Sequence, residues 1–335
     1  SGVYLEKLKK IIQKVLNNKF VLPVINGTSA LHLALIASGI NKNDEVIVPD
    51  LSYVSAANSV KYIGAVPNLV DIDIENYSKC SKKLKIYLKK ICIKKNGYLF
   101  NKKSKRFIKA LILVHVFGYP GHILEIKKIC KKFKLKFIED SSECLGSYYK
   151  NKHLGTFGDF GVLSFNGNKI ITTGGGGAVI CNSKKELSLL EHISKNSKVS
   201  HKWKFYHDCL GYNYKLSNLS ASLGYSQILR LNYFLKKRLN LFNKYSKILS
   251  QIDGIKMYKP LFDSKPNHWL ISFRLDLNYS KLQSKILNFL VKKKIFSRPP
   301  WELMSNLPMY KNCPKDNNCN ARKIQKSVIC LPSSI

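Results

Sequence analysis

The first 140 residues alternate between short apolar runs and longer amphipathic stretches, and this alternation constrains the fold more than any other feature. Apolar runs of this length, bounded by Gly, Pro or polar residues, are typical of buried strands, and the stretches between them are typical of helices. Such an order predicts an α/β domain with a mainly parallel central sheet. Strands are predicted near 20–24, 44–50, 66–73, 109–120 and 135–140, and helices at 27–40, 52–64, 79–95 and 122–134.

The rest of the chain predicts two further short strands, at 160–165 and 177–182, followed by helices at 184–196 and 216–250. From about residue 251 the pattern is that of a smaller α/β unit. We therefore expect a large domain over 1–250 and a small C-terminal domain over 251–335. The first 18 residues resemble the end of a helix and contain no initiating Met, so we expect that an N-terminal piece of the large domain is missing.

The net charge of +37 raises the question of nucleic-acid binding, because phosphate contacts use Lys and Arg. The basic residues are 51 Lys and only 6 Arg, and the lysines are spread along the chain without a basic tail. Bidentate recognition of phosphates and bases prefers Arg. The charge is therefore interpreted as a compositional bias that helps to attract anionic ligands, and no nucleic-acid partner is expected.

Neither a membrane segment nor a metal site is expected. No run of about 18 apolar residues occurs, which argues against a transmembrane helix. The nine cysteines form no C-x-x-C pair, and no His lies at zinc-finger spacing. An odd number of cysteines without a secretion signal indicates reduced thiols in a cytoplasm.

Several chemically useful side chains lie at or near the C-terminal ends of predicted strands: Thr28, Tyr53, His115 and Asp140. Ligands of parallel sheets bind at the carboxyl ends of the strands. Thr28 and Ser29 open a helix, whose free N–H groups are suited to bind phosphate. The alternative is that Thr28 simply caps this helix.

Asp140 and Lys169 have two interpretations each. Asp140 either caps the turn after its strand or holds the ring nitrogen of a cofactor. Lys169 either is a solvated surface lysine or is a reactive amine, and its neighbours favour the second: it lies in "SFNGNKIITTGGGG", where glycines allow close approach to a ligand. A phosphate-binding turn, a reactive lysine, an acid and an aromatic ring together form the set that pyridoxal phosphate requires.

With these motifs in this order, the chain resembles the DegT/DnrJ/EryC1/StrS family of sugar aminotransferases. The resemblance covers nearly the whole chain, through "NGTSALHLAL", "DEVIVPDLSYVSAANSV", "HVFGYP", "IEDSSECLGS", "GYNYKLSNLSASLG" and the tail from "RPPW" to "LPSS". It implies the type I (aspartate aminotransferase) fold, pyridoxal phosphate as cofactor, and a homodimer with shared active sites.

The resemblance also implies roles for individual residues. Lys169 matches the Schiff-base lysine, and Asp140 matches the acid that pairs with the pyridine nitrogen. Thr28 and Ser29 match the phosphate-binding turn, and Ser164 matches a serine that also contacts the phosphate.

Three further positions complete the expected cofactor site. Tyr53 matches an aromatic ring stacked on the cofactor, and Asn213 matches an asparagine that reaches the neighbouring subunit's phosphate. Glu143 is a departure, because many members have Gln there, near the cofactor's ring hydroxyl. Lys215 is another, since many members have Arg at that position.

The remaining candidates concern the substrate. Arg298 and Trp301, in "RPPW", are candidate sugar or nucleotide contacts, and Trp269 is a weaker one. His115 either touches substrate or is a satisfied core histidine, and the core is favoured. His153 precedes the site in a loop and is expected at the surface.

Within the family, the motifs look most like the LegC-like subgroup. This implies amination of a UDP-4-keto-6-deoxy-N-acetylhexosamine, with glutamate as amino donor, for bacterial surface glycans of the bacillosamine or legionaminic type. The alternatives are a GDP- or dTDP-linked sugar, a 3-keto sugar, or a binding protein without catalysis.

Overall fold

A computed structural model describes residues 2–335 and contains one large mixed sheet. The seven strands of its main path run in the order β1–β11–β10–β7–β6–β2–β3. Their bounds are Val21–Val24 (β1), Gly177–Ile180 (β11), Phe160–Ser164 (β10), Lys136–Asp140 (β7), Arg106–Val114 (β6), Glu45–Pro49 (β2) and Val66–Val70 (β3).

Most neighbouring strands of this path are parallel, and β11 runs antiparallel to both β1 and β10. The predicted α/β class with a mainly parallel sheet is confirmed. In consequence β1, β10, β7, β6, β2 and β3 all end at the same edge of the sheet, and the residues that follow them are brought together there.

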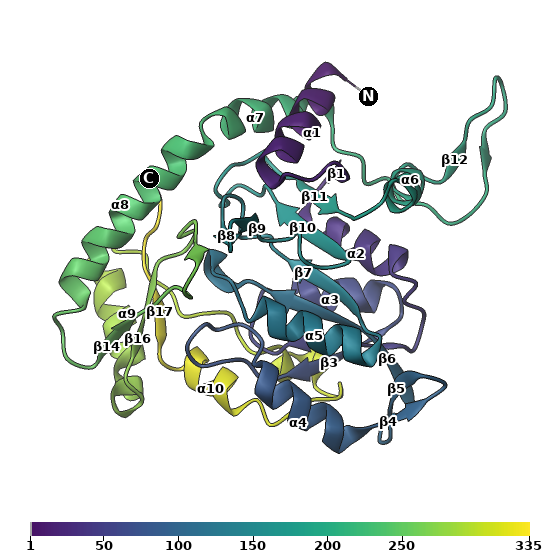
Figure 1. Ribbon diagram of the computed structural model, residues 1–335. Coiled ribbons are helices and arrows are strands. Elements are labelled where there is room, and N and C mark those ends of the chain that lie inside the picture. Colours follow the sequence, from purple (N-terminus) through teal and green to yellow (C-terminus); the bar gives the residue numbers. More distant parts are fainter. Residues whose placement is uncertain (1) are drawn as a thin grey trace.

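Helices cover both faces of this sheet (Figure 1). Strand β6 shows why, since Ala110 and Ile112 belong to one apolar cluster while Leu111 and Leu113 belong to another. Successive side chains of a strand point to opposite faces, so a continuous apolar run needs cover on both. Helices α2 (Gly27–Ala37) and α3 (Ser55–Tyr62) contribute to the first cluster, and α4 (Ser81–Ile91) and α5 (Ile123–Phe133) to the second.

The remaining elements lie around the sheet. Helix α1 (Val3–Leu16) packs on α7 (Asn218–Leu229), and α6 (Lys184–Ile193) contacts α2. A second sheet consists of β14 (Ile255–Met257), β16 (Ser272–Leu275) and β17 (Val328–Cys330), and it packs with α9 (Gln283–Lys292) and the end of α8 (Leu231–Leu249). A third small sheet joins β15 (Ser264–Lys265), β8 (Tyr148–Tyr149) and β9 (Lys152–His153). The division at residue 250 stays a prediction.

Two predicted helices differ from the structure. The helix expected over 79–95 ends at Ile91, and a hairpin of β4 (Cys92–Lys95) and β5 (Tyr98–Asn101) follows. Its two loop residues, Asn96 and Gly97, both have positive φ, as tight two-residue hairpins require. The helix expected over 216–250 is divided at Arg230 into α7 and α8.

The segment after residue 300 returns to the large sheet and covers its edge at β3. The Leu69 N–H donates to the Pro314 carbonyl (2.8 Å), and the Asp316 N–H donates to the Leu69 carbonyl (2.9 Å). These bonds pair backbone groups that an edge strand otherwise leaves open.

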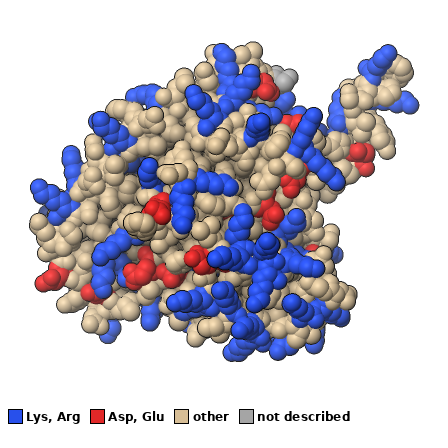
Figure 2. Space-filling model, viewed as in Figure 1, with Lys and Arg blue, Asp and Glu red and all other residues tan. Residues whose placement is uncertain are grey.

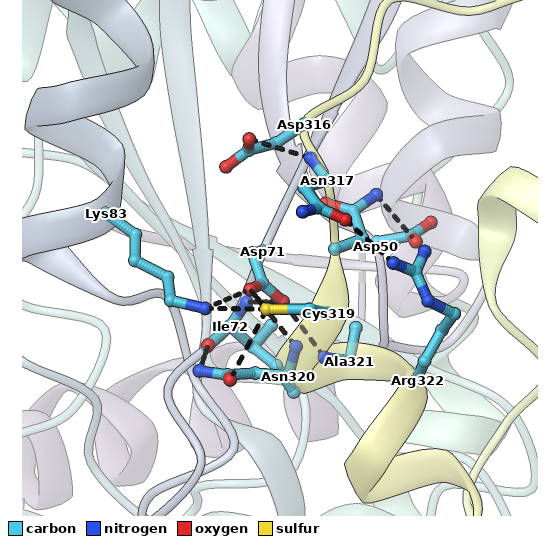
Figure 3. Close-up of polar contacts among 11 residues, drawn as sticks. Asp50, Asp71, Ile72, Lys83, Asp316, Asn317, Cys319, Asn320, Ala321 and Arg322 are labelled. Atoms are coloured by element: carbon cyan, nitrogen blue, oxygen red, sulfur yellow. Dashed lines mark hydrogen bonds and ion pairs between the residues drawn. The ribbon is translucent and has the colours of Figure 1, made fainter.

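Two buried carboxylates hold this returning segment (Figure 3). Asp71 accepts hydrogen bonds from the Ala321 N–H (2.9 Å) and the Asn320 N–H (3.2 Å) at the start of α10 (Cys319–Gln325), and from Lys83 Nζ (2.6 Å). Asp50 accepts from Ser305 and Asn318, further along the same segment. A carboxylate at a helix N-terminus also complements the helix dipole.

We expect Asp71→Asn to destabilise the fold by about 2–3 kcal/mol at pH 7, because it removes the negative charge to which Lys83 and several backbone amides donate. Burial alone would raise the pKa of Asp71, but hydrogen bonds from Lys83 and from backbone amides outweigh burial and lower it. The ionised carboxylate therefore stabilises the fold above its unfolded-state pKa, and this contribution is lost as pH falls through the lower folded-state pKa. Urea unfolding at pH 7 and in acid measures both effects. The exposed Asp253→Asn is the control, and equal unfolding midpoints for the two variants would contradict the assignment.

A hairpin of β12 (Lys198–Val199) and β13 (Tyr206–His207) projects from the body of the molecule (Figure 1). It exposes large apolar side chains, with Trp203 74% and Phe205 83% accessible. Over residues 2–335, no helix combines the length and the apolar character needed to span a membrane.

Candidate active site

A cavity of about 560 Å³ lies where the parallel strands end. Its wall includes residues at or after the ends of β1, β2, β7 and β10, together with Trp269, Arg298 and Trp301 from the C-terminal part of the chain. The predicted site residues that line it are Thr28, Tyr53, Asp140, Glu143, Ser164, Lys169, Arg298 and Trp301.

Lys169 lies in the loop between β10 and β11, and its side chain is mostly buried. Its Nζ is 3.3 Å from Glu143 Oε1 and 4.0 Å from the ring centroid of Trp269. The indole N–H of Trp269 donates to the Asn168 carbonyl (2.7 Å), which fixes the ring beside the amine. The lysine is thus held in the cavity by a carboxylate and an aromatic face, unlike the solvated lysines of the surface.

Glu143 is 6% exposed and accepts a hydrogen bond from the Phe117 N–H (2.7 Å) in addition to the bond from Lys169. Burial raises the pKa of Glu143, and the Lys169 charge and the Phe117 amide oppose this only in part. A second ionisable group therefore lies against Lys169.

The raised pKa of Glu143 predicts a pH-dependent cost to stability. The folded protein holds this proton more tightly than the unfolded chain does, so stability falls as pH rises above about 4.3, the ordinary Glu pKa. Glu143→Gln removes the free-energy cost of ionising this buried carboxyl. We therefore expect the melting temperature of the variant to rise relative to that of the wild type as pH rises from about 4.3 to 7. Thermal unfolding of cofactor-free protein measures this, with exposed Glu125→Gln as control. Parallel profiles for wild type and Glu143→Gln would refute it.

Asp140 is the last residue of β7 and is 5% exposed. Its Oδ1 accepts from the Ser142 N–H (3.1 Å), so the carboxylate caps its turn as one interpretation expected. It also lines the cavity. Asp140 thus caps its turn, and its place in the cavity wall leaves its role at the cofactor a prediction.

The N-terminus of α2 opens into the same cavity, with Gly27 and Thr28 in its wall. Thr28 is not the cap of this helix, because Asn26 is: its Oδ1 accepts from the Ser29 N–H (2.7 Å). Among the described residues, the amides of Gly27 and Thr28 have no hydrogen-bond partner. A Cβ on Gly27 would lie 3.0 Å from the Ser164 Cβ, so only glycine leaves this space clear. The result is a small cradle with free N–H groups, suited to a phosphate.

Two predicted cofactor residues lie outside the cavity wall of this single chain. Ser29 is buried in the first turn of α2. Asn213 is exposed, in the segment that precedes α7. Their proposed contacts with cofactor remain predictions, and that of Asn213 requires a second chain.

His115 lies in the core rather than in the cavity wall. It is fully buried, its Nε2 is 3.0 Å from Glu139 Oε2, and its Nδ1 accepts from the Gly121 N–H (3.2 Å). With both ring nitrogens engaged, it has the environment of a structural histidine, as the favoured interpretation expected.

The expectation that His153 lies at the surface is wrong. Its ring is 2% exposed, Nε2 accepts from the Gly146 N–H (2.9 Å), and Nδ1 donates to the Leu154 carbonyl (2.6 Å). Burial lowers the pKa of His153 to about 4. It is therefore a neutral structural residue, and its loop is folded into the protein.

Sequence reasoning missed several polar residues of the wall: Asn26, Ser55, Ser142, Asn166 and Asn168. The two asparagines beside Lys169 and the serine after Asp140 lie within motifs that were already singled out, so their neighbourhood was a usable signal. Ser55 lies at the start of α3 and follows β2, as Tyr53 does.

Comparisons with known proteins identify the family of the chain. The model of the DegT/DnrJ/EryC1/StrS aminotransferase family matches residues 1–335. A protein of Escherichia coli O157:H7 named GDP-perosamine synthase is 33% identical over 309 residues, which cover 92% of this chain and 79% of that protein. A Campylobacter jejuni protein named UDP-4-amino-4,6-dideoxy-N-acetyl-beta-L-altrosamine transaminase is 31% identical over 73% of this chain and 62% of its own length. The crystal structure of Helicobacter pylori PseC, an aminotransferase of pseudoaminic acid biosynthesis, matches 99% of this chain and 86% of its own, with a TM-score of 0.88 and 24% identity.

Proposed function

The chain belongs to the DegT/DnrJ/EryC1/StrS aminotransferase family, and we propose that it aminates C4 of a GDP-linked 4-keto-6-deoxy sugar. It is a sugar aminotransferase with the predicted type I fold, and its cofactor is pyridoxal phosphate. The observation that carries the proposal is the convergence of Lys169, Asp140 and the free amides of α2 on one cavity.

The proposed nucleotide is GDP, whereas the resemblance to the LegC-like subgroup implied UDP. The LegC-like, UDP-linked assignment is not supported by the relative with the higher coverage, whose name specifies GDP. A UDP-linked substrate is the second candidate, supported by the Campylobacter relative at lower coverage. The name of the Campylobacter relative specifies a 4-amino-4,6-dideoxy sugar, which favours C4 over C3 as the site of amination.

The residues present are suited to pyridoxal phosphate. The cradle at Gly27 and Thr28 offers free N–H groups to the phosphate, with Ser164 beside it. Asp140 would pair with the ring nitrogen and Tyr53 would cover the ring. When bound, the cofactor supplies an aldehyde that bonds an amine and a ring that takes up the electrons released at the amine's carbon.

Lys169 would hold the aldehyde carbon of the cofactor and release it to the amino donor. The free Lys169 amine would act first as a base at the donor's α-carbon and then as an acid. Asp140 keeps the proton on the ring nitrogen, which favours uptake of electrons by the ring. The same residues work in the opposite direction when the keto sugar replaces the donor.

The partners follow from the same proposal. Glutamate is the proposed amino donor, and a cytoplasm the proposed location. A homodimer with shared sites is proposed because Asn213 is exposed and does not line the cavity of its own chain, while the hairpin of β12 and β13 presents apolar side chains. Sedimentation analysis would test the dimer, and a monomer at micromolar concentration would reject it.

A two-stage absorbance experiment tests the function. Glutamate is added to the purified holoenzyme, and the cofactor spectrum is expected to change to that of the amine form. GDP- or UDP-linked 4-keto-6-deoxy sugar is then added separately, and the GDP compound is expected to restore the first spectrum. Restoration by the UDP compound alone would select the second candidate, and no change with glutamate would overturn the function.

A further inference from the structure

A second cavity, of about 630 Å³, adjoins the first and is lined by half of the arginines of this chain. Asn168, Lys169, Trp269 and Arg298 line both cavities. The second cavity also contains Arg230 and Arg238, so three of its 15 lining residues are arginines, although the whole chain has only 6. We call it the arginine cavity. Most positive charges of the chain are lysines. A cluster of arginines therefore favours a ligand that is bound by the planar guanidinium group, such as a phosphate or a carboxylate.

The charged side chains that line the arginine cavity are all basic: Lys169, Arg230, Arg238 and Arg298. No Asp or Glu is among its lining residues, and within residues 2–335 none of its three arginines has a carboxylate oxygen within 4.0 Å. Arg274, elsewhere in the fold, shows the usual alternative: it pairs with Glu75 at 3.0 Å. The arginines of the cavity are thus available to an external anion.

Arg238 provides an independent observation. It is 7% exposed, and its Nη1 donates to the Trp269 carbonyl (2.6 Å) and the Ser333 carbonyl (2.8 Å). Its buried Nε has no acceptor in the part of the chain that the structure describes. A buried guanidinium without a carboxylate is costly, and an anion in the adjoining cavity would offset that cost.

Arg230 and Arg298 present their guanidinium groups at the rim. Arg230 lies where α7 ends, over the rings of Tyr233 (5.2 Å) and Phe234 (5.5 Å), and Arg298 lies 6.0 Å from the ring of Trp301. Both residues are exposed, and the one hydrogen bond from either guanidinium is a long one, from Arg298 Nη1 to the Pro299 carbonyl (3.5 Å), so donors of both remain open to a ligand. The aromatic rings restrict where the guanidinium groups lie.

We propose that the arginine cavity binds the diphosphate of the nucleotide-sugar substrate. Two guanidinium groups match a diphosphate, whose oxygens accept paired hydrogen bonds. Because the two cavities share Lys169 and Arg298, a diphosphate held here leaves the attached sugar directed toward Lys169. This inference rests on the proposed function and deepens it, since it identifies which residues select a substrate linked through a diphosphate.

Calorimetric titration of the holoenzyme with GDP tests the proposal without any turnover. Arg230→Gln and Arg298→Gln are each expected to weaken GDP binding at least about tenfold, because each loses charge-assisted hydrogen bonds. Arg322→Gln, an exposed arginine outside the cavity, removes the same charge and is expected to bind GDP as the wild type does. Inorganic pyrophosphate is expected to compete with GDP in the wild type.

Unchanged GDP affinity in both cavity variants would overturn the proposal. So would a loss of glutamate binding in those variants with GDP binding intact, because the cavity would then serve the donor's carboxylates. The outcome is separate from that of the proposed function. Arginine-dependent GDP binding in an enzyme whose spectrum glutamate does not change would retain the cavity and reject the reaction.

Discussion

Replacement of Lys169 by Ala is expected to lower the rate of amino transfer by a factor of about 10³ or more, because one side chain both holds the cofactor and carries the proton. The fold should survive, since the side chain lies at the cavity wall and not in the apolar core. Borohydride reduction followed by peptide mass spectrometry gives a readout that does not depend on turnover. In the wild type the cofactor should be fixed to the peptide that contains Lys169, and in the variant no such peptide should appear.

Lys128→Ala is the matched control, because Lys128 is an exposed lysine of α5 outside the cavity. It should retain both the rate and the labelled peptide. An active Lys169→Ala enzyme, or a cofactor fixed to a different lysine, would show that the loop between β10 and β11 has another purpose.

Asp140→Asn is expected to lower the rate about 10²-fold or more while leaving the turn intact. The two roles of Asp140 separate in this variant, since the Asn Oδ1 can still accept from the Ser142 N–H but carries no charge for the ring nitrogen. The unfolding midpoint should therefore stay close to that of the wild type. The absorbance spectrum of the bound cofactor should change, because it reports the protonation of the ring.

Asp253→Asn, at an exposed position, controls for the loss of one negative charge from a strongly basic protein. Wild-type activity together with an unchanged spectrum in Asp140→Asn would mean that Asp140 only caps its turn. A large fall in the unfolding midpoint of Asp140→Asn would contradict the expectation that the turn stays intact.

Much of the fold could be predicted from the sequence, because a parallel sheet covered on both faces has a simple signature. Strands such as β6 and β7 are short apolar runs, and amphipathic helices follow or precede them. The hairpin of β4 and β5 was not predicted, although Asn96-Gly97 is a typical hairpin turn. The Lys-rich pattern before the turn continues with helical spacing into residues 92–95, and this favoured a helix there. The break at Arg230 carries neither Gly nor Pro, so nothing local marks it.

The candidate site could be predicted where each residue ends a strand or belongs to a motif, as Asp140, Ser164 and Lys169 do. The arginine cavity could not, since it brings together α7, α8 and the C-terminal segment, which are far apart in the sequence. His153 was misplaced for a related reason. A loop position gives no local sign of burial, and tertiary contacts at Gly146 decided the matter.

The returning C-terminal segment also has a consequence for how the protein is made. Its bonds join residues 250 and 255 positions apart, at Asp71–Ala321 and Asp50–Ser305. Contacts of such long range form late, since the entropy of closing the loop must be overcome first. During synthesis, β3 therefore remains an open sheet edge until the segment around residues 314–316 has left the ribosome, and open edges pair readily with other chains. Truncation before residue 314 would therefore leave the backbone groups of β3 without the partners that the returning segment supplies.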